Sequence, residues 1–320
     1  TTVDLQSGLL RYSLARFWKV FTSTRAGALS ALMQKRWGIT AQLSDLPEKP
    51  RWMINATCYE TGKNWRFEQF RMGDYRFGYT YDTNIPLTDA MAASAGFPGL
   101  IGALMIDTTK FTWFNYLEKS AVNPLRASVS EHKQRKTQPI QPDFDKVHLW
   151  DGGAYDNHGL EGVHNFNTGW REGVDFLIVS DGAGRSKPEK YQPGAKATLR
   201  LMTGIMMDQV RSLRSRAILE RLINHADQDR GGFLQIGNTL TEVLRGSKHE
   251  GEIQHLKEGC LSEAEVKLAV DMPTVIRKLT PEEFSRLFRH GFEVADYTLY
   301  AYNDDQFEYI RFGRSQGSLI

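Results

Sequence analysis

An aspartate followed by two glycines, Asp151-Gly152-Gly153, is the feature of this sequence that points most directly to chemistry. It comes directly after the apolar run Val147-His148-Leu149-Trp150, which predicts a buried strand. Sites of α/β folds collect at the carboxyl ends of strands, and two glycines allow a sharp turn beside the carboxylate. Such a carboxylate can act as a general base. A plain turn is the alternative interpretation, because Asp-Gly pairs are common in turns.

Several other residues have side chains that could do chemistry, but their surroundings in the sequence do not predict it. Ser94 lies in the small-residue run 92–99 but has no GxSxG elbow around it, so we expect it to pack against a neighbour rather than to catalyse. Asp156, His158 and His164 follow the aspartate motif at a spacing that matches no established metal-ligand pattern, so no metal is predicted. The basic run 132–136 predicts an exposed loop, and it is too short and too poor in aromatic residues to predict nucleic-acid binding.

Composition predicts an ordinary globular protein. The 320 residues are 41% hydrophobic and 24% charged, and the net charge of +2 gives no overall field that would favour nucleic acid. Two cysteines cannot build a framework of several disulfides. No apolar run approaches the roughly 20 residues that span a bilayer, so no transmembrane helix is expected.

The elements that position these residues follow from hydrophobic periodicity and turn residues. Strands separated by helices favour an α/β domain with a mostly parallel sheet. The last helix begins at Thr280-Pro281-Glu282-Glu283, a capping box with proline at the first helical position. The predicted helices cover 9–21, 26–35 with Gly38 as C-cap, 87–95, 199–223 and 281–299, and the predicted strands cover 52–57, 65–70, 147–150 and 174–180.

Taken in order, several segments resemble the patatin-like phospholipases, a family of lipid acyl hydrolases. The resemblance is clear from residue 51 to 222. It implies a three-layer α/β/α fold with a mostly parallel central sheet whose N-terminal part is absent, in one domain over 1–320 with a helical C-terminal extension at 224–320. The matching segments are Ile54-Asn55-Ala56-Thr57, Glu60-Thr61-Gly62, Met72-Gly73-Asp74-Tyr75, 92–99, 151–159, 178–181 and 207–214.

The resemblance also implies a mechanism. In this family a serine in a GxSxG elbow attacks an ester, an aspartate in a DG[GA] motif is its base, and a glycine-rich strip binds the oxyanion, without cofactor or metal. Because Asp151-Gly152-Gly153 matches the DG[GA] motif, the resemblance implies that Asp151 is the base and that Gly152 and Gly153 form the turn that holds it. Asp181-Gly182-Ala183 also fits DG[GA], but its surroundings resemble a later segment of the family.

The nucleophile is missing from the matching segments. Nothing from Thr1 to Arg51 matches the elbow or the oxyanion strip, so the serine is expected upstream of Thr1, and Arg230-Gly231-Gly232 comes too late to be the strip. The one literal GxSxG, 313–317, leaves three residues for the helix that an elbow needs, and Ser315 receives no role.

Two functions are therefore expected from the sequence. The first is a lipid acyl hydrolase that cleaves carboxylic ester bonds of phospholipids or related acyl lipids with a Ser/Asp dyad. The second is a catalytically inactive lipid- or protein-binding module. The expected partners are an acyl-ester lipid and a membrane surface in peripheral contact, with no nucleic acid, in a cytoplasmic or peripheral membrane location. The oligomeric state stays open.

Overall fold

The computed structural model describes residues 5, 25–98, 101–117, 125–184 and 188–313, and these form two compact units. The first unit contains the described residues of 3–174 and 190–213, and the second contains those of 175–189 and 214–320. The amphipathic helix predicted at 9–21 lies outside the described residues. Each unit has its own buried core.

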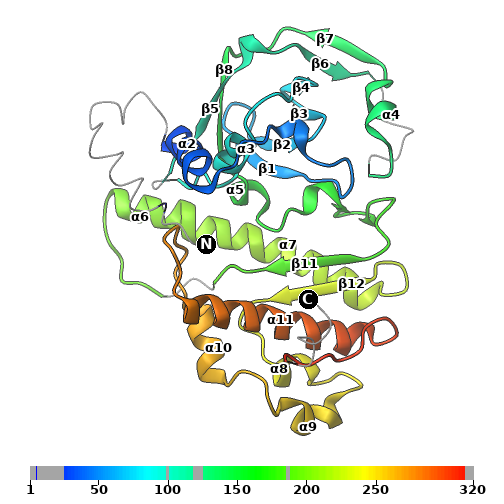
Figure 1. Ribbon diagram of the computed structural model, residues 1–320. Helices are drawn as coiled ribbons and strands as arrows, with labels where there is room; N and C mark the ends of the chain where they lie inside the picture. Colours follow the sequence, from blue (N-terminus) through cyan, green and yellow to red (C-terminus); the bar gives the residue numbers. More distant parts are fainter. Residues whose placement is uncertain (1–4, 6–24, 99–100, 118–124, 185–187, 314–320) are drawn as a thin grey trace. The chain divides into compact units, whose positions relative to one another are not determined.

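A curled eight-stranded sheet forms the centre of the first unit (Figure 1). Its strand order is β5-β8-β1-β2-β3-β4-β6-β7, and all neighbouring strands are antiparallel. The strands are β1 (Ile54–Cys58), β2 (Lys63–Glu68), β3 (Arg71–Asp74), β4 (Gly78–Thr80), β5 (Leu104–Asp107), β6 (Trp113–Tyr116), β7 (Thr137–Ile140) and β8 (Lys146–Asp151).

The predicted three-layer α/β/α fold with a mostly parallel sheet is therefore wrong. Strands β1 to β4 follow one another through turns of two to four residues, which can join only antiparallel neighbours, because a parallel pair needs a long crossover connection. Gly62, with φ of 64°, makes the first of these turns. Among the described residues the one parallel pair is β11 (Leu177–Asp181) with β12 (Gly231–Gln235), and a long helical segment separates these two strands in the chain.

Helices α2 (Arg25–Trp37) and α3 (Leu87–Ser94) pack against each other, and α3 contacts β1, β5 and β8. The core beneath them holds Trp65, Phe67 and Trp113. Short α5 (Gly153–Asp156) contacts β1, β2 and β8. The remaining elements of this unit are η2 (Leu43–Asp45), η3 (Thr108–Lys110), α4 (Val129–Lys133), η4 (Leu160–Gly162), β9 (His164–Asn165), β10 (Gly169–Trp170), α6 (Ala195–Arg200), η5 (Leu201–Met206) and the first part of α7 (Met207–Asn224).

The second unit packs helices around β11 and β12. Helix α11 (Pro281–Asn303) runs along β12 (Figure 1) and begins with the predicted capping box between Thr280 and Glu283. The core of the second unit includes Leu244, Val294 and Tyr297. The other helices of this unit are the end of α7, α8 (Leu240–Leu244), η6 (Glu250–Glu252), α9 (Ile253–Lys257) and α10 (Glu263–Val270).

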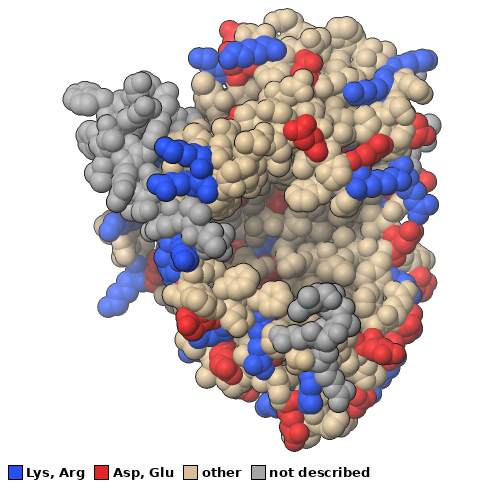
Figure 2. Space-filling view, in the orientation of Figure 1, with Lys and Arg blue, Asp and Glu red and all other residues tan. Residues whose placement is uncertain are grey.

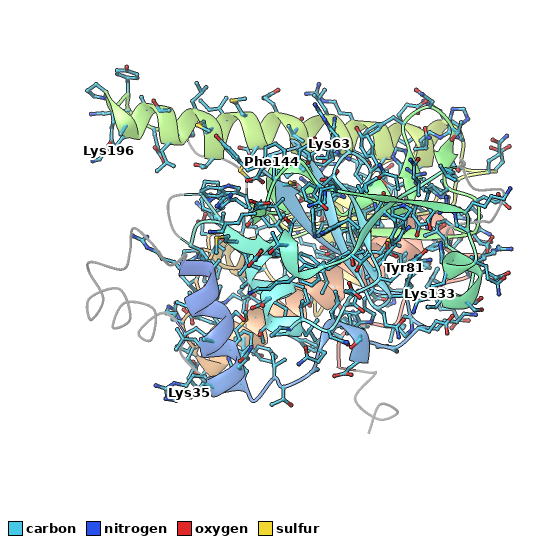
Figure 3. The ribbon with its side chains drawn as sticks, turned by 90° about the horizontal axis from the view of Figure 1, so that it is seen from above. Lys35, Lys63, Tyr81, Lys133, Phe144 and Lys196 are labelled. Carbon is cyan, nitrogen blue, oxygen red and sulfur yellow. The ribbon has the colours of Figure 1, made fainter. Side chains whose placement is uncertain are left out.

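The basic run 132–136 is exposed only in part: Lys133, Gln134 and Lys136 are exposed, as its composition predicts, whereas His132 is not. Its first two residues end α4, and His132 is buried with its ring stacked on Phe70 at 4.8 Å between centroids. Lys133 lies over the ring of Tyr81, 5.8 Å from its centroid (Figure 3). Aromatic side chains far away in the sequence, Phe70 and Tyr81, thus contact the start of this segment, which the local sequence does not reveal.

The surface carries mixed charge. Figure 2 shows Lys and Arg interspersed with Asp and Glu over the face in view, in keeping with a net charge of +2. In the part of the chain that the structure describes, no helix combines the length and apolar character needed to cross a membrane.

Candidate functional site

Strand β8 ends at Asp151, as the sequence predicts, and the sheet fixes the main chain there. Asp151 pairs with Ala56 of β1. Its carbonyl oxygen accepts a hydrogen bond from Thr57 Oγ1 at 2.7 Å, and its amide donates to the carbonyl of Gly96 at 3.2 Å. The aspartate is therefore anchored from two sides before the chain turns into α5.

The small-residue helix end and the aspartate motif, 55 residues apart in sequence, meet in the structure. The amide of Gly152 donates to the carbonyl of Ser94 at 3.3 Å. A Cβ added at Gly96 would lie 3.3 Å from the Asp151 amide and 2.8 Å from the carbonyl oxygen of Gly102. Small residues at the end of α3 thus permit close contact between two stretches of backbone. Ser94 contributes its carbonyl, and within the described residues its hydroxyl forms no hydrogen bond with Asp151.

Each of the two glycines of the motif is required for a different steric reason. A Cβ at Gly152 would lie 2.4 Å from the backbone carbonyl oxygen of Asn55, so β1 leaves no room for a side chain there. A Cβ at Gly153 would lie 2.9 Å from Asp151 Oδ1 and 2.8 Å from Asn157 Oδ1. Gly152 therefore permits the packing of the turn, and Gly153 clears the space beside the carboxylate.

The Asp151 carboxylate is held by one oxygen. Oδ1 accepts a hydrogen bond from the Gly153 amide at 2.7 Å, whereas Oδ2 accepts none from the residues that the structure describes. Burial raises the pKa of Asp151 above its ordinary value, and the Gly153 amide opposes that shift only in part. A carboxylate with a raised pKa is a stronger base than an ordinary aspartate, and its open oxygen can accept a proton.

The residues after the motif pack locally. Asp156 is buried, and its Oδ2 accepts a hydrogen bond from the Glu161 amide at 2.7 Å. His164 is buried against Trp170, with ring centroids 5.5 Å apart. The two ring nitrogens of His158 are shielded from solvent. Over the described ranges, no three His, Cys, Asp or Glu side chains come together as a metal site would require.

The second DG[GA] match has a different environment. Asp181 ends β11 in the second unit, and its Oδ1 accepts from the Ala183 amide at 3.2 Å. A Cβ at Gly182 would have no neighbour within 4 Å, in contrast to Gly152. The Asp181 turn therefore lacks the steric constraint of the Asp151 turn. Ser315 lies outside the described residues.

Sequence reasoning missed a polar row on β2. Asn64 and Arg66 alternate with the buried Trp65 and Phe67, so they lie on the face of the sheet opposite the core. They line a cavity together with Tyr155 of α5, four residues after Asp151. The alternation Asn-Trp-Arg-Phe-Glu was the signal available in the sequence, because it gives the strand one polar face. A polar strand face that a helix covers calls for an explanation.

Replacing Gly153 with alanine is expected to perturb the carboxylate without unfolding the protein. The atoms that the new methyl group meets are ends of side chains, which can rotate away. We expect a folded protein in which the hydrogen bond from the Gly153 amide to the Asp151 carboxylate is lost. Protein NMR of the Asp151 carboxyl carbon measures this directly: its apparent pKa should change in Gly153→Ala, and an unchanged titration would contradict the role given to Gly153.

Comparison with known proteins identifies no relative. No model of a known protein family matches the sequence, and neither a curated protein nor a solved structure matches it. The candidate site therefore rests on its own geometry.

Proposed function

We propose that this protein is a carboxylic ester hydrolase that acts on acyl lipids, with Asp151 as the general base of a serine nucleophile. The observation that carries the proposal is the state of the Asp151 carboxylate, which has one oxygen fixed by Gly153, one oxygen open, and a pKa raised by burial. The lipid class of the substrate rests on the resemblance of the sequence segments to patatin-like phospholipases.

The chemistry requires one proton acceptor and one nucleophile. As the serine Oγ attacks the ester carbonyl, Asp151 Oδ2 takes the hydroxyl proton, and that proton passes to the departing alcohol. Water then attacks the acyl-serine and gives one proton to Asp151, which passes it to the serine Oγ as the fatty acid leaves. Hydrogen-bond donors must stabilise the oxyanion in both steps. The proposal assigns neither the serine nor these donors to a described residue.

Release of fatty acid from phospholipid vesicles tests the function. We expect the full-length protein to release fatty acid from a diacyl phospholipid, and to hydrolyse a soluble p-nitrophenyl ester more slowly. A peptide substrate with no ester serves as the control and should stay intact. Failure to release fatty acid or p-nitrophenol at high enzyme concentration would overturn the proposal.

The rate of hydrolysis should depend on pH through Asp151. Only the carboxylate form accepts a proton, and burial raises its pKa, so kcat/KM should fall as pH drops through a value above about 3.9, the ordinary value for aspartate. A profile of kcat/KM between pH 3 and 9 measures this. A profile whose acid limb lies at or below that ordinary value would contradict a role for this buried carboxylate.

A binding module is the second candidate function, and one observation favours it. Within the described residues no serine hydroxyl forms a hydrogen bond with the Asp151 carboxylate. A catalytically inactive module would bind phospholipid vesicles or a protein partner and release no fatty acid. Vesicle co-sedimentation without hydrolysis would favour this function over the enzyme.

A further inference from the structure

A small polar cavity lined by β2 and by Tyr155 of α5 contains an arginine that forms no ion pair among the described residues. The cavity has a volume of about 80 Å³, and its lining comes from the outer face of β2, β3 and β4 and from the segment after Asp151. That volume holds a few water molecules or one small oxyanion. The lining residues are Asn64, Arg66, Glu68, Arg71, Gly73, Tyr75, Tyr79, Tyr155 and Glu161.

Arg66 is the unusual residue in this lining. Its Nε is sealed from solvent and has no hydrogen-bond partner, and among the described residues its guanidinium forms no ion pair. Burial lowers the pKa of Arg66, and the positive charges of Arg71 and Arg171 also lower it, while Glu68 raises it. A partly buried guanidinium whose Nε is sealed from solvent and unpaired is costly unless a ligand or another charge satisfies it.

The nearest carboxylate is already engaged. Glu68 is buried, and its Oε1 accepts from Arg71 Nε at 2.9 Å while its Oε2 accepts from Arg51 Nε at 2.8 Å. Arg51 and Arg71 thus share the one carboxylate of Glu68. These three side chains together carry a net positive charge, to which Arg66 adds another. Glu161 also lines the cavity.

The remaining lining favours an oxygen-rich anion. The cross-strand neighbours of Arg66 are Asn55 and Gly73, so one side of the arginine carries no side chain. Tyr79 has its pKa raised by burial and keeps its proton, and no described residue bonds its hydroxyl. A guanidinium with a tyrosine hydroxyl can donate several hydrogen bonds to one phosphate group.

From this cavity we infer that the protein binds a phosphate group against Arg66 and Tyr79. This deepens the proposed function and rests on it in one respect: in an acyl-lipid hydrolase the bound phosphate belongs to the headgroup of a phospholipid substrate. Tyr155 connects the cavity to the aspartate motif along the chain. Free inorganic phosphate has the same chemistry, and the experiment separates the two sources.

Isothermal titration with sodium phosphate, on the full-length protein, tests the cavity itself. Arg66→Gln should raise the dissociation constant for phosphate about tenfold or more, and Tyr79→Phe about threefold. Arg76→Gln is the matched control, because Arg76 is an exposed arginine that follows β3 and does not line the cavity, and it should leave the constant unchanged. Removing a partly buried charge that forms no ion pair should not lower the melting temperature, so Arg66→Gln stays folded.

A second arm identifies the source of the phosphate. In an Asp151→Asn background, which prevents turnover, a short-chain diacyl phospholipid should bind about tenfold more weakly when Arg66→Gln is added, whereas the matching diacylglycerol should be unaffected. If Arg66→Gln weakens the binding of inorganic phosphate but not the binding of phospholipid, the ligand is free phosphate. Phosphate affinity that is absent, or equal in wild type and Arg66→Gln, would overturn the inference and leave the role of Asp151 in hydrolysis untouched.

Discussion

Asp151→Asn in the full-length protein is expected to lower kcat for ester hydrolysis by about 10²- to 10⁴-fold, the range that a general base contributes. The asparagine side-chain oxygen can still accept the hydrogen bond from the Gly153 amide, so the turn should keep its shape. What disappears is the capacity to accept a proton at the open oxygen. Measurement of kcat on a soluble ester, with a melting curve for each protein, gives the result.

Stability separates loss of chemistry from loss of fold in this variant. The pKa of Asp151 is higher in the folded than in the unfolded protein, so the folded state binds its proton more tightly. Its charge therefore destabilises the fold at pH values above both pKa values, and that cost disappears as pH falls through the folded-state pKa toward the unfolded one. Asp151→Asn should be at least as stable as wild type at pH 7. An inactive variant with a much lower melting temperature would not support a catalytic role, and full activity would exclude it.

Gly152→Ala is expected to destabilise the protein by about 3 kcal/mol, at the upper end of the cost of overpacking. The added Cβ would lie 2.4 Å from the Asn55 carbonyl oxygen, a backbone atom that cannot move without distorting β1. Urea unfolding followed by tryptophan fluorescence reports on the first unit, because Trp65 and Trp113 lie in its core. Circular dichroism also follows the helices of the second unit, which contains Gly182.

Gly182→Ala is the matched control for that experiment. It changes the same position of the other Asp-Gly turn, where a Cβ has open space around it. Its free energy of unfolding should change by no more than about 0.5 kcal/mol, as is usual for surface substitutions. Equal effects of the two substitutions would mean that the contact between the motif and β1 is not as tight as the structure describes.

Local signals in the sequence predicted the longer helices and four of the twelve strands that the structure describes, but not their assembly. The capping box at Thr280 predicted the start of α11, and Gly38, with φ of 69°, closes α2 as expected. The apolar run before Asp151 predicted β8. The direction of strand pairing was missed, because an apolar strand reads the same in parallel and antiparallel sheets, although the short connection at Gly62 was a usable sign of a hairpin.

The candidate site was predicted in part. The Asp151 motif is recognisable from its residues alone, because glycine positions reflect local steric limits. The contact of Gly152 with Asn55 and the meeting of the motif with residues 94–96 join segments far apart in sequence, which no local pattern encodes. The same limit hid Arg66, whose significance appears only when Glu68 is seen bound by two other arginines.

Covalent labelling with a fluorophosphonate, followed by mass spectrometry of the labelled peptide, tests the central claim most directly. The proposed mechanism predicts that the full-length protein is labelled on a single serine, and that Asp151→Asn slows the labelling by about 100-fold because the serine loses its base. Absence of any labelled serine, or labelling at the same rate in wild type and Asp151→Asn, would contradict the assignment of Asp151 as the base.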